Sequence, residues 1–309
     1  MLKNQGLNQE ERGCELLTAE SLQTSCEPGS SGDGCGVETQ DGMGEPAAQM
    51  VIKLGYRGAG FAGFAKQPGI RTVQQEVEQA LEVFLRRPVE TTCAGRTDSG
   101  VHAQGQYVSL PVYGEELQLK EKRILSALSA LVGDDISIKQ VYRAAPDFSA
   151  RFSAVARHYR YRIYPHHDRP ILAWTWAWWL RQDLDVDAMQ EGARYLLGEL
   201  DFKSFCKAIS AVEKPTHRYV SSLEVSRVQE AGEEMVIIDI CGNAFLHSMV
   251  RTITGTLVEV GRGHRSCQWV QQVQQACDRK AAGPCAPAHG LVFVDVDYPE
   301  GALKLWESH

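Results

Sequence analysis

The chain has 309 residues, of which 43% are hydrophobic and 23% charged, and this composition is ordinary for a water-soluble globular protein of one or two domains. It contains no apolar run long enough to cross a membrane, and its N-terminus lacks the basic stretch and apolar core of a signal peptide. The sequence therefore predicts a cytoplasmic protein with no membrane partner.

The formal charge of -7 is concentrated in one segment of the chain. Residues 1–48 contain nine acidic and two basic residues, so residues 49–309 contain 30 of each sign. Within this neutral body, the stretch from Arg151 to Arg169 holds five Arg and three His against Asp168 alone. A local positive patch is enough to bind phosphates, so the negative total does not exclude a nucleic-acid partner.

The composition of residues 1–48, which are rich in Gly and Ser, predicts a disordered acidic tail. So polar a segment buries too little apolar surface to become ordered. A short helix over residues 10–22 is the one regular element it could form. The nine cysteines of the whole chain include no Cys-x-x-Cys pair and no Cys/His spacing typical of zinc, so we expect reduced thiols and no metal site. The glycines at 58–63 do not have the spacing of a dinucleotide-binding loop.

An N-terminal α+β half is predicted over residues 49–150. A strand over 50–56 precedes a helix that a capping box opens at Thr72 and that ends near Arg87-Pro88. A second helix covers 121–132, and a strand follows over 136–142. The apolar positions expected to face the core are Val73, Val77, Leu81 and Phe84 in the first helix and Ile124, Leu125, Leu128 and Leu131 in the second. This order of elements predicts helices on a largely antiparallel or mixed sheet.

The most distinctive stretch of this half is Ala94-Gly-Arg-Thr-Asp-Ser-Gly-Val-His102, which places Arg96 and Asp98 in a tight turn between two apolar runs. Its glycines stand where a positive φ or a close backbone approach would be needed. A carboxylate presented on such a turn is a candidate nucleophile or base. The alternative is an Asx-turn, in which Asp98 bonds its own backbone and Arg96 forms a surface ion pair.

A C-terminal α+β half is predicted over residues 151–300, followed by a tail at 301–309. Its first strand, 157–164, is expected to place Tyr159, Tyr161 and Ile163 on one face and His158, Arg160 and Arg162 on the other. Four tryptophans follow between 174 and 179, and core or interface packing is favoured for them over a stacking platform for bases. We then expect a helix over 186–197 capped by Gly198, and strands over 219–228, 235–241 and 290–296.

The last predicted helix covers residues 246–260. Its positions Met249, Val250, Ile253 and Leu257 are expected to face the core. His247 and Arg251 lie four residues apart on an adjoining flank, where such side chains are usually solvated.

Three motifs, in this order, resemble those of the TruA-type tRNA pseudouridine synthases: the turn at 94–102, the segments 147–154 and 157–164, and Phe245-Leu-His-Ser-Met-Val-Arg251. The family pattern has Ala where this chain has Ser99, and a Gly-Trp-Gln step where it has Gly63-Phe64-Ala65. Ser99 could add a hydrogen bond to the Asp98 carboxylate and lower its pKa. Ala65 lacks the side-chain amide that the family has at this position, so its side chain offers no hydrogen bond to a base.

The resemblance implies the pseudouridine synthase fold, in which two ferredoxin-like or RRM-like halves form one mixed, largely antiparallel sheet flanked by helices, with an RNA cleft between them. It implies isomerisation of uridine to pseudouridine in the anticodon arm of tRNA by a homodimer. That reaction involves no net redox change or hydrolysis, so no cofactor is expected. It needs a carboxylate beside the sugar and a pocket that excludes water.

The resemblance also implies the site residues. Asp98 is the expected catalytic carboxylate, Arg251 its basic partner, and Tyr159 the ring over the target base. Tyr159 could accept the C5 proton only if a cation such as Arg251 lowered the pKa of its phenol. The residues implied to contact the substrate are Arg96, Phe64, His102, Arg157, Arg160, His247 and Leu291.

Two other functions compete with this hypothesis. A catalytically silent RNA-binding protein of the same fold would be free to lose Asp98, and this chain retains it. A hydrolase dependent on an aspartate would need metal-binding acids or a second catalytic carboxylate, and the sequence offers no obvious candidate near the motif.

Overall fold

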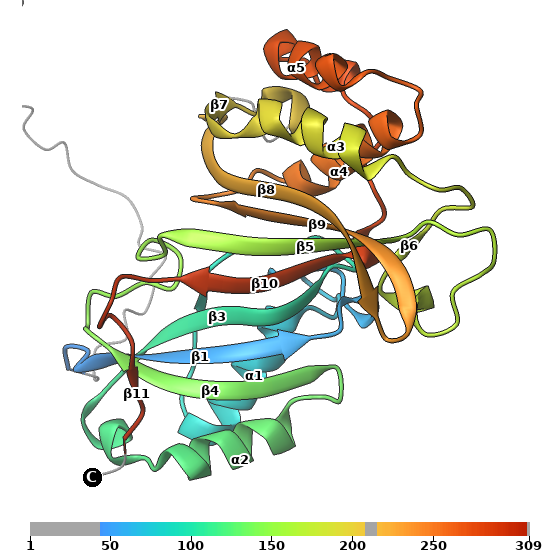
Figure 1. The fold of residues 1–309 in the computed structure, drawn as a ribbon. Helices are drawn as coiled ribbons and strands as arrows, with labels where there is room; N and C mark the ends of the chain where they lie inside the picture. The colour runs from blue at the N-terminus through green and yellow to red at the C-terminus, as the bar shows by residue number, and fades with distance from the viewer. Residues whose placement is uncertain (1–43, 208–214, 308–309) are drawn as a thin grey trace, which may run out of the picture. The chain divides into compact units, whose positions relative to one another are not determined.

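The computed structural model describes residues 44–207 and 215–307, so the helix considered for residues 10–22 lies outside the described residues (Figure 1). The strands of the first half are β1 Ala48–Tyr56, β2 Thr92–Cys93, β3 His102–Val112 and β4 Ile136–Ala144. Those that follow are β5 Ala156–Tyr164, β6 Trp178–Trp179, β7 Gly198–Asp201, β8 His217–Glu230, β9 Glu233–Gly242, β10 Leu291–Asp297 and β11 Lys304–Leu305. The helices are α1 Val73–Leu85, α2 Glu121–Leu131, α3 Val186–Ala193, α4 Met249–Gly261 and α5 Cys267–Ala276.

Within these residues the strands form one 11-stranded sheet in the order β11-β4-β1-β3-β10-β5-β9-β8-β7, with β2 paired to β3 and β6 to β5. Neighbouring strands run antiparallel except for β10 beside β3 and β6 beside β5. Helices α1 and α2 accompany the strands of the first half, and α3, α4 and α5 those of the second (Figure 1). The predicted α+β fold with a mixed, largely antiparallel sheet is confirmed. None of the helices in the described ranges combines the length and apolar character that a membrane crossing needs.

Strand β10 joins the two halves of the sheet. It comes from the end of the chain, yet it lies between β3 and β5, with Val292 opposite His102 on one side and Leu291 opposite Tyr161 on the other. The turn that precedes β3 therefore lies close to the first residue of β10 and to the middle of β5.

The helices of the first half form largely as their sequence predicts. Thr72 Oγ1 accepts a hydrogen bond from the N–H of Gln75 at 3.4 Å, which is the predicted cap of α1. The helix ends at Leu85 because Arg86 takes a left-handed φ of 57°. In α2, the prediction for Leu131 is wrong, since this last residue of the helix is 43% exposed.

Three predicted boundaries are corrected by the structure. Helix α3 ends at Ala193 and continues as a 3-10 turn to Leu196, and Gly198 opens β7 with a φ of +91° instead of capping a helix. Helix α4 begins at Met249, three residues later than predicted. In the predicted tail at 301–309, β11 pairs with β4, and the buried Trp306 donates its indole N–H to the carbonyl of Leu119 at 2.7 Å.

Strand β5 has the predicted alternation, with Tyr159, Tyr161 and Ile163 buried on one face. On the other face Arg162 is also buried, because it forms an ion pair with Glu230 at 2.8 Å and lies over a tryptophan ring. The tryptophans of 174–179 are partly buried apart from the exposed Trp174. The predicted packing role therefore fits most of this cluster.

Candidate active site

The turn that carries Asp98 lies between β2 and β3 and has an ordered backbone. The N–H of Val101 donates to the carbonyl of Asp98 at 3.1 Å, and Gly100 adopts a φ of +83° beside it. The side chain of Gln106 accepts from the N–H of Gly95 and donates to its carbonyl. Because these bonds fix the backbone, the Asp98 side chain leaves the turn in a defined direction.

The Asp98 carboxylate meets donors from the start of helix α4. Its Oδ2 accepts hydrogen bonds from Ser248 Oγ and Arg251 Nη1, both at 2.9 Å, and His247 Nε2 lies 3.2 Å from Oδ1. The described residues show no bond from the carboxylate to its own backbone, so the Asx-turn alternative is not formed. With 23% of its side chain exposed, Asp98 is anchored and still accessible.

Ser248 explains how three side chains of one segment reach the same carboxylate. Its φ of 61° is left-handed, which is uncommon for Ser and costs on the order of 1 kcal/mol. This bend delays the helix to Met249, and with it His247, Ser248 and Arg251 all reach Asp98. Arg251 is also fixed from behind, because its Nε donates to the carbonyl of Ala286 at 2.8 Å.

The serine that bonds Asp98 is not the one that the sequence suggests. Ser99 Oγ donates instead to the carbonyl of Phe61 at 3.1 Å. Its hydroxyl therefore supports the neighbouring loop, and the departure from Ala at this position leaves the carboxylate untouched.

Tyr159 forms an aromatic floor beside the turn. Its ring packs edge to face against Phe245 at 5.0 Å and Phe293 at 4.9 Å between centroids. Its hydroxyl lies near Gly95, where an added Cβ would come within 3.7 Å of the oxygen. Burial raises the pKa of Tyr159 above its ordinary value, and the positive charge of Arg157 opposes this only in part. In the free protein the pKa of Tyr159 is thus raised, and the condition set for Tyr159 to accept a proton, a pKa lowered by a cation such as Arg251, is not met.

Three of the predicted substrate-contacting residues line or support the turn from within the core. Leu291 is buried at the first position of β10, beside the floor. Phe64 is fully buried, and its N–H donates to the carbonyl of Thr97 at 3.1 Å. The buried His102 accepts from the N–H of Gly58 through Nδ1 at 3.2 Å, and burial lowers its pKa. In this structure, Phe64 and His102 hold the loops around Asp98 in place.

Arg157, which the motif suggests as a substrate contact, is buried, and its bonds within the described part of the chain all go to backbone carbonyls. Its Nη2 donates to Ala94 at 3.1 Å and to Arg151 at 2.5 Å, and its Nη1 donates to Ala154 and Asn243. One guanidinium therefore ties together the start of the turn, the segment before β5 and the segment before α4.

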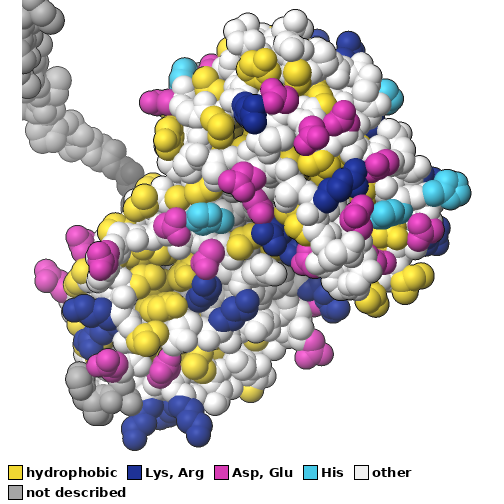
Figure 2. All heavy atoms as spheres, viewed as in Figure 1, with side chains coloured by type: hydrophobic (Ala, Val, Ile, Leu, Met, Phe, Trp, Pro, Cys, Tyr) yellow, Lys and Arg dark blue, Asp and Glu magenta, His cyan; other side chains and the backbone are white. Residues whose placement is uncertain are grey.

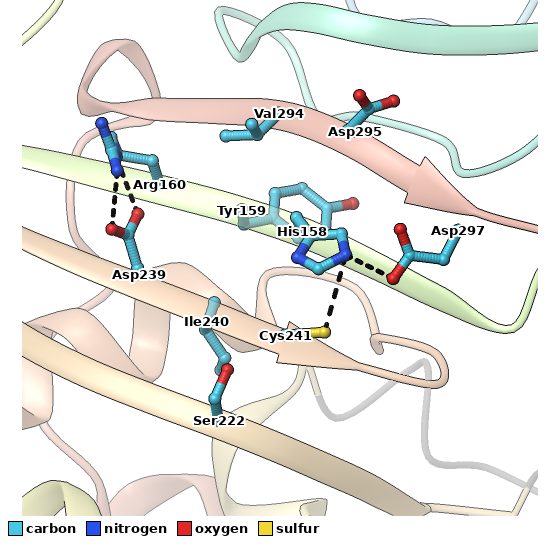
Figure 3. A pocket seen from close by; sticks show the side chains of 10 residues that line it. All are labelled: His158, Tyr159, Arg160, Ser222, Asp239, Ile240, Cys241, Val294, Asp295 and Asp297. Atoms are coloured by element: carbon cyan, nitrogen blue, oxygen red, sulfur yellow. Dashed lines mark hydrogen bonds and ion pairs between the residues drawn. The ribbon is translucent and has the colours of Figure 1, made fainter.

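Arg160 lies on the opposite face of β5 from Tyr159. It forms a two-point ion pair with Asp239, with both distances at 2.7 Å, and in Figure 3 it projects forward from the ribbon behind which the Tyr159 ring lies. This face holds a shallow pocket, and Figure 2 shows acidic and basic side chains interspersed over it. Arg96, in contrast, is exposed on the turn itself and makes no ion pair among the described residues.

The site contains residues that sequence reasoning did not single out. Ser248 lies inside the motif Phe245–Arg251, but its hydroxyl donates to Asp98 and does not cap α4, so the usual preference for Ser at a helix start does not indicate its role. Phe245 and Phe293 complete the floor, and only their apolar character within a predicted motif and strand pointed to them. No pattern in the sequence indicates that Arg157 bonds carbonyls rather than phosphates.

The assembled site combines an accessible carboxylate, two basic side chains and a buried aromatic floor. An anchored carboxylate can stabilise or attack an electron-poor carbon, and the apolar floor limits the access of water. No group of three or more His, Cys, Asp or Glu side chains suited to a metal ion occurs in residues 44–207 and 215–307.

Comparisons with known proteins agree on one family. The family model described as tRNA pseudouridine synthase matches residues 193–299. The tRNA pseudouridine synthase A of Aliivibrio salmonicida is 39% identical over 260 residues, which span 82% of this chain and 93% of the relative. Enzymes of the same name from Vibrio campbellii and Vibrio parahaemolyticus are each 41% identical over 257 residues, covering 81% of this chain and 93% of their own.

Proposed function

We propose that this chain modifies uridines of the anticodon stem-loop and that Asp98 is its catalytic carboxylate. The proposal starts from the family: the chain belongs to the tRNA pseudouridine synthase A family and is an isomerase acting on tRNA. The observation that carries the proposal is the set of contacts around Asp98. Ser248, Arg251 and His247 hold one carboxylate at the edge of a buried aromatic floor.

The two oxygens of Asp98 have different surroundings. Oδ2 accepts two hydrogen bonds, from Ser248 and Arg251, whereas among the described residues Oδ1 has a single charged neighbour, His247, at 3.2 Å. Oδ1 is therefore the oxygen with more capacity left for the substrate. The donors on Oδ2 fix the direction in which Oδ1 points, as a nucleophile or an electrostatic stabiliser requires.

The isomerisation breaks the bond between N1 of uracil and C1′ of ribose and forms a bond between C5 and C1′. While the base is detached, the sugar carbon is electron-poor and water would capture it. Asp98 supplies the negative charge for that carbon. The rings of Tyr159, Phe245 and Phe293 form the aromatic floor, on which the detached uracil can turn while water is kept away from the sugar carbon.

The target nucleotide has to leave its stack before it reaches Asp98, since a stacked base hides the bond that is cut. Arg96 is exposed on the same turn and free of ion pairs among the described residues. It is therefore suited to bind a flanking phosphate or to fill the gap that the target base leaves in the RNA stack. The raised pKa of Tyr159 keeps its phenol neutral in the free protein. We assign the Tyr159 ring, which is fixed between Phe245 and Phe293, to positioning the base.

We further propose that the protein is a cytoplasmic homodimer. Support comes from an exposed apolar patch formed by Ile171, Leu172 and Trp174, which a second copy could cover. Light scattering after size exclusion should give twice the mass of the chain. A concentration-independent monomer mass would contradict this part of the proposal.

The proposed activity is tested by incubating unmodified tRNA with the full chain and mapping pseudouridine by mass spectrometry after chemical labelling. We expect pseudouridine in the anticodon arm, and none when the uridines there are replaced by cytidine. Release of free uracil would instead indicate a hydrolase. Tight tRNA binding with no product would indicate the silent RNA-binding protein.

A further inference from the structure

Arg151 and Phe152 stand at the tip of the segment between β4 and β5. The Phe152 side chain is 80% exposed, and the Arg151 guanidinium lies 5.3 Å from the centroid of its ring. A single exposed apolar side chain is common on protein surfaces, so the case for Phe152 depends on the surroundings of its ring.

The turn that presents them is firmly held. The N–H of Ala150 donates to Ser109 Oγ at 3.0 Å, and the hydroxyl of Tyr298 donates to the carbonyl of Ala150 at 2.8 Å. Ser149 and Ser153 bond each other's backbone, with the N–H of Ser149 donating to Ser153 Oγ at 3.1 Å. Phe152 is therefore displayed by an ordered turn.

This turn lies directly beside the Asp98 turn. A single nitrogen of Arg157 bonds the carbonyls of both Ala94 and Arg151, so the two backbones lie within a few ångströms of each other. Cys93 marks the same proximity. Burial raises the pKa of its thiol to about 11, and the positive charges of Arg96 and Arg151 both oppose that rise.

Arg151 is exposed and, like Arg96, makes no ion pair with any acidic side chain in the described ranges. Two unpaired arginines and an exposed ring on a rigid edge form a surface of the kind that binds single-stranded nucleic acid, where bases stack on aromatics and phosphates meet cations.

We propose that Arg151 and Phe152 form an RNA-binding ledge at the rim of the active site, on which an unpaired base of the tRNA stacks while Arg151 contacts a phosphate. This inference rests on the proposed function, because it takes the tRNA as the occupant. It adds a docking contact outside the catalytic cluster, on a turn next to the one that carries Arg96.

The test measures tRNA affinity for Phe152→Ala, Phe152→Trp and Arg151→Gln, with Val83→Ala as the control. Val83 is a 63% exposed apolar residue on α1, and its truncation should leave the affinity unchanged. Phe152→Ala should weaken binding about tenfold, and Phe152→Trp should restore it because the larger ring also stacks. Arg151→Gln should reduce the slope of log Kd against log salt by about one.

A blunt RNA duplex provides a second discriminating readout, since it offers no unpaired base. Phe152→Ala should leave duplex binding within about twofold. The ledge is refuted if Phe152→Ala keeps its tRNA affinity within twofold of wild type or if Phe152→Trp fails to restore that affinity. It is also refuted if Phe152→Ala weakens binding of the duplex as much as binding of the tRNA.

Pseudouridine formation by the wild-type chain is measured alongside, so that the two proposals can fail separately. If no pseudouridine forms and Phe152→Ala still weakens tRNA binding tenfold, the proposed function fails and the ledge stands. If pseudouridine forms and the Phe152 variants bind like wild type, the ledge alone fails.

Discussion

The two faces of strand β5 differ in how their charges are satisfied. On one face, Arg160 pairs with Asp239 and His158 with Asp297, each at 2.8 Å or less (Figure 3). On the other face, the aromatic floor of Tyr159 lies beside Asp98, and His247 is the charged neighbour of Asp98 Oδ1 among the described residues. Exposed ion pairs contribute little to stability, and matched charges have little left for a ligand. The difference teaches that an oxygen with spare bonding capacity beside the aromatic floor, more than the number of charges, distinguishes the face on which we propose the chemistry.

The largest effect among the contacts of Asp98 is expected at Arg251. Arg251→Gln removes a charged donor to Oδ2, and preorganised donors of this kind are worth about 100-fold or more in rate. The rate of pseudouridine formation at saturating tRNA measures the change. A variant within threefold of wild type would show that the ion pair is structural.

The next largest effect is expected at Tyr159, where two variants distinguish the role of the ring from that of the hydroxyl. Tyr159→Leu should slow the reaction by about 100-fold, because loss of the edge-to-face contacts with Phe245 and Phe293 lets the base shift. Tyr159→Phe keeps those contacts, so its reaction rate should fall clearly less than that of Tyr159→Leu. Equal losses in the two variants would move the function to the hydroxyl, against the neutral phenol that burial favours.

A matched pair of serines then tests which hydroxyl serves the carboxylate. Ser248→Ala removes a hydrogen bond to Asp98, worth about 1.5 kcal/mol, and should slow turnover about tenfold. Ser99→Ala should leave the rate unchanged, because that hydroxyl donates to the carbonyl of Phe61. Single-turnover rates of the two variants, measured side by side, decide the point, and the reverse order would overturn the assignment.

The smallest effect is expected on the opposite face. Arg160→Gln breaks an ion pair with Asp239 that is partly exposed, so the free energy of unfolding should fall by less than about 1 kcal/mol. The isomerisation rate should stay within about twofold. A loss of tRNA affinity of tenfold or more in filter binding would return Arg160 to the substrate-contacting set.

The sequence allowed the long strands of the sheet, helices α1 to α4, and Asp98, His247 and Arg251 to be predicted, whereas helix α5 and the contact of Ser248 with Asp98 were missed. Local signals sufficed where they act within a few residues, as at the Thr72 cap of α1. The start of α4 was missed because a left-handed Ser248 leaves no mark in the apolar periodicity.

The roles of the arginines could not be predicted for a related reason. Arg157 and Arg160 belong to one basic stretch and lie on opposite faces of β5, but the alternation does not indicate their partners: one is buried among carbonyls and the other is paired with Asp239. Their partners come from segments far along the chain, so only tertiary structure tells a backbone clamp from a phosphate contact. Arg151, in the same stretch, is left exposed.

The central claim is that the carboxylate on the Tyr159 face, and not one on the opposite face, performs the chemistry. Asp98→Asn and Asp239→Asn make the same chemical change on the two faces, and the direct measurement is the single-turnover rate of pseudouridine formation with saturating enzyme. We predict a loss of at least about 1000-fold for Asp98→Asn, or about 4 kcal/mol in barrier, and a rate within about twofold for Asp239→Asn. A rate for Asp98→Asn within about tenfold of wild type would contradict the account.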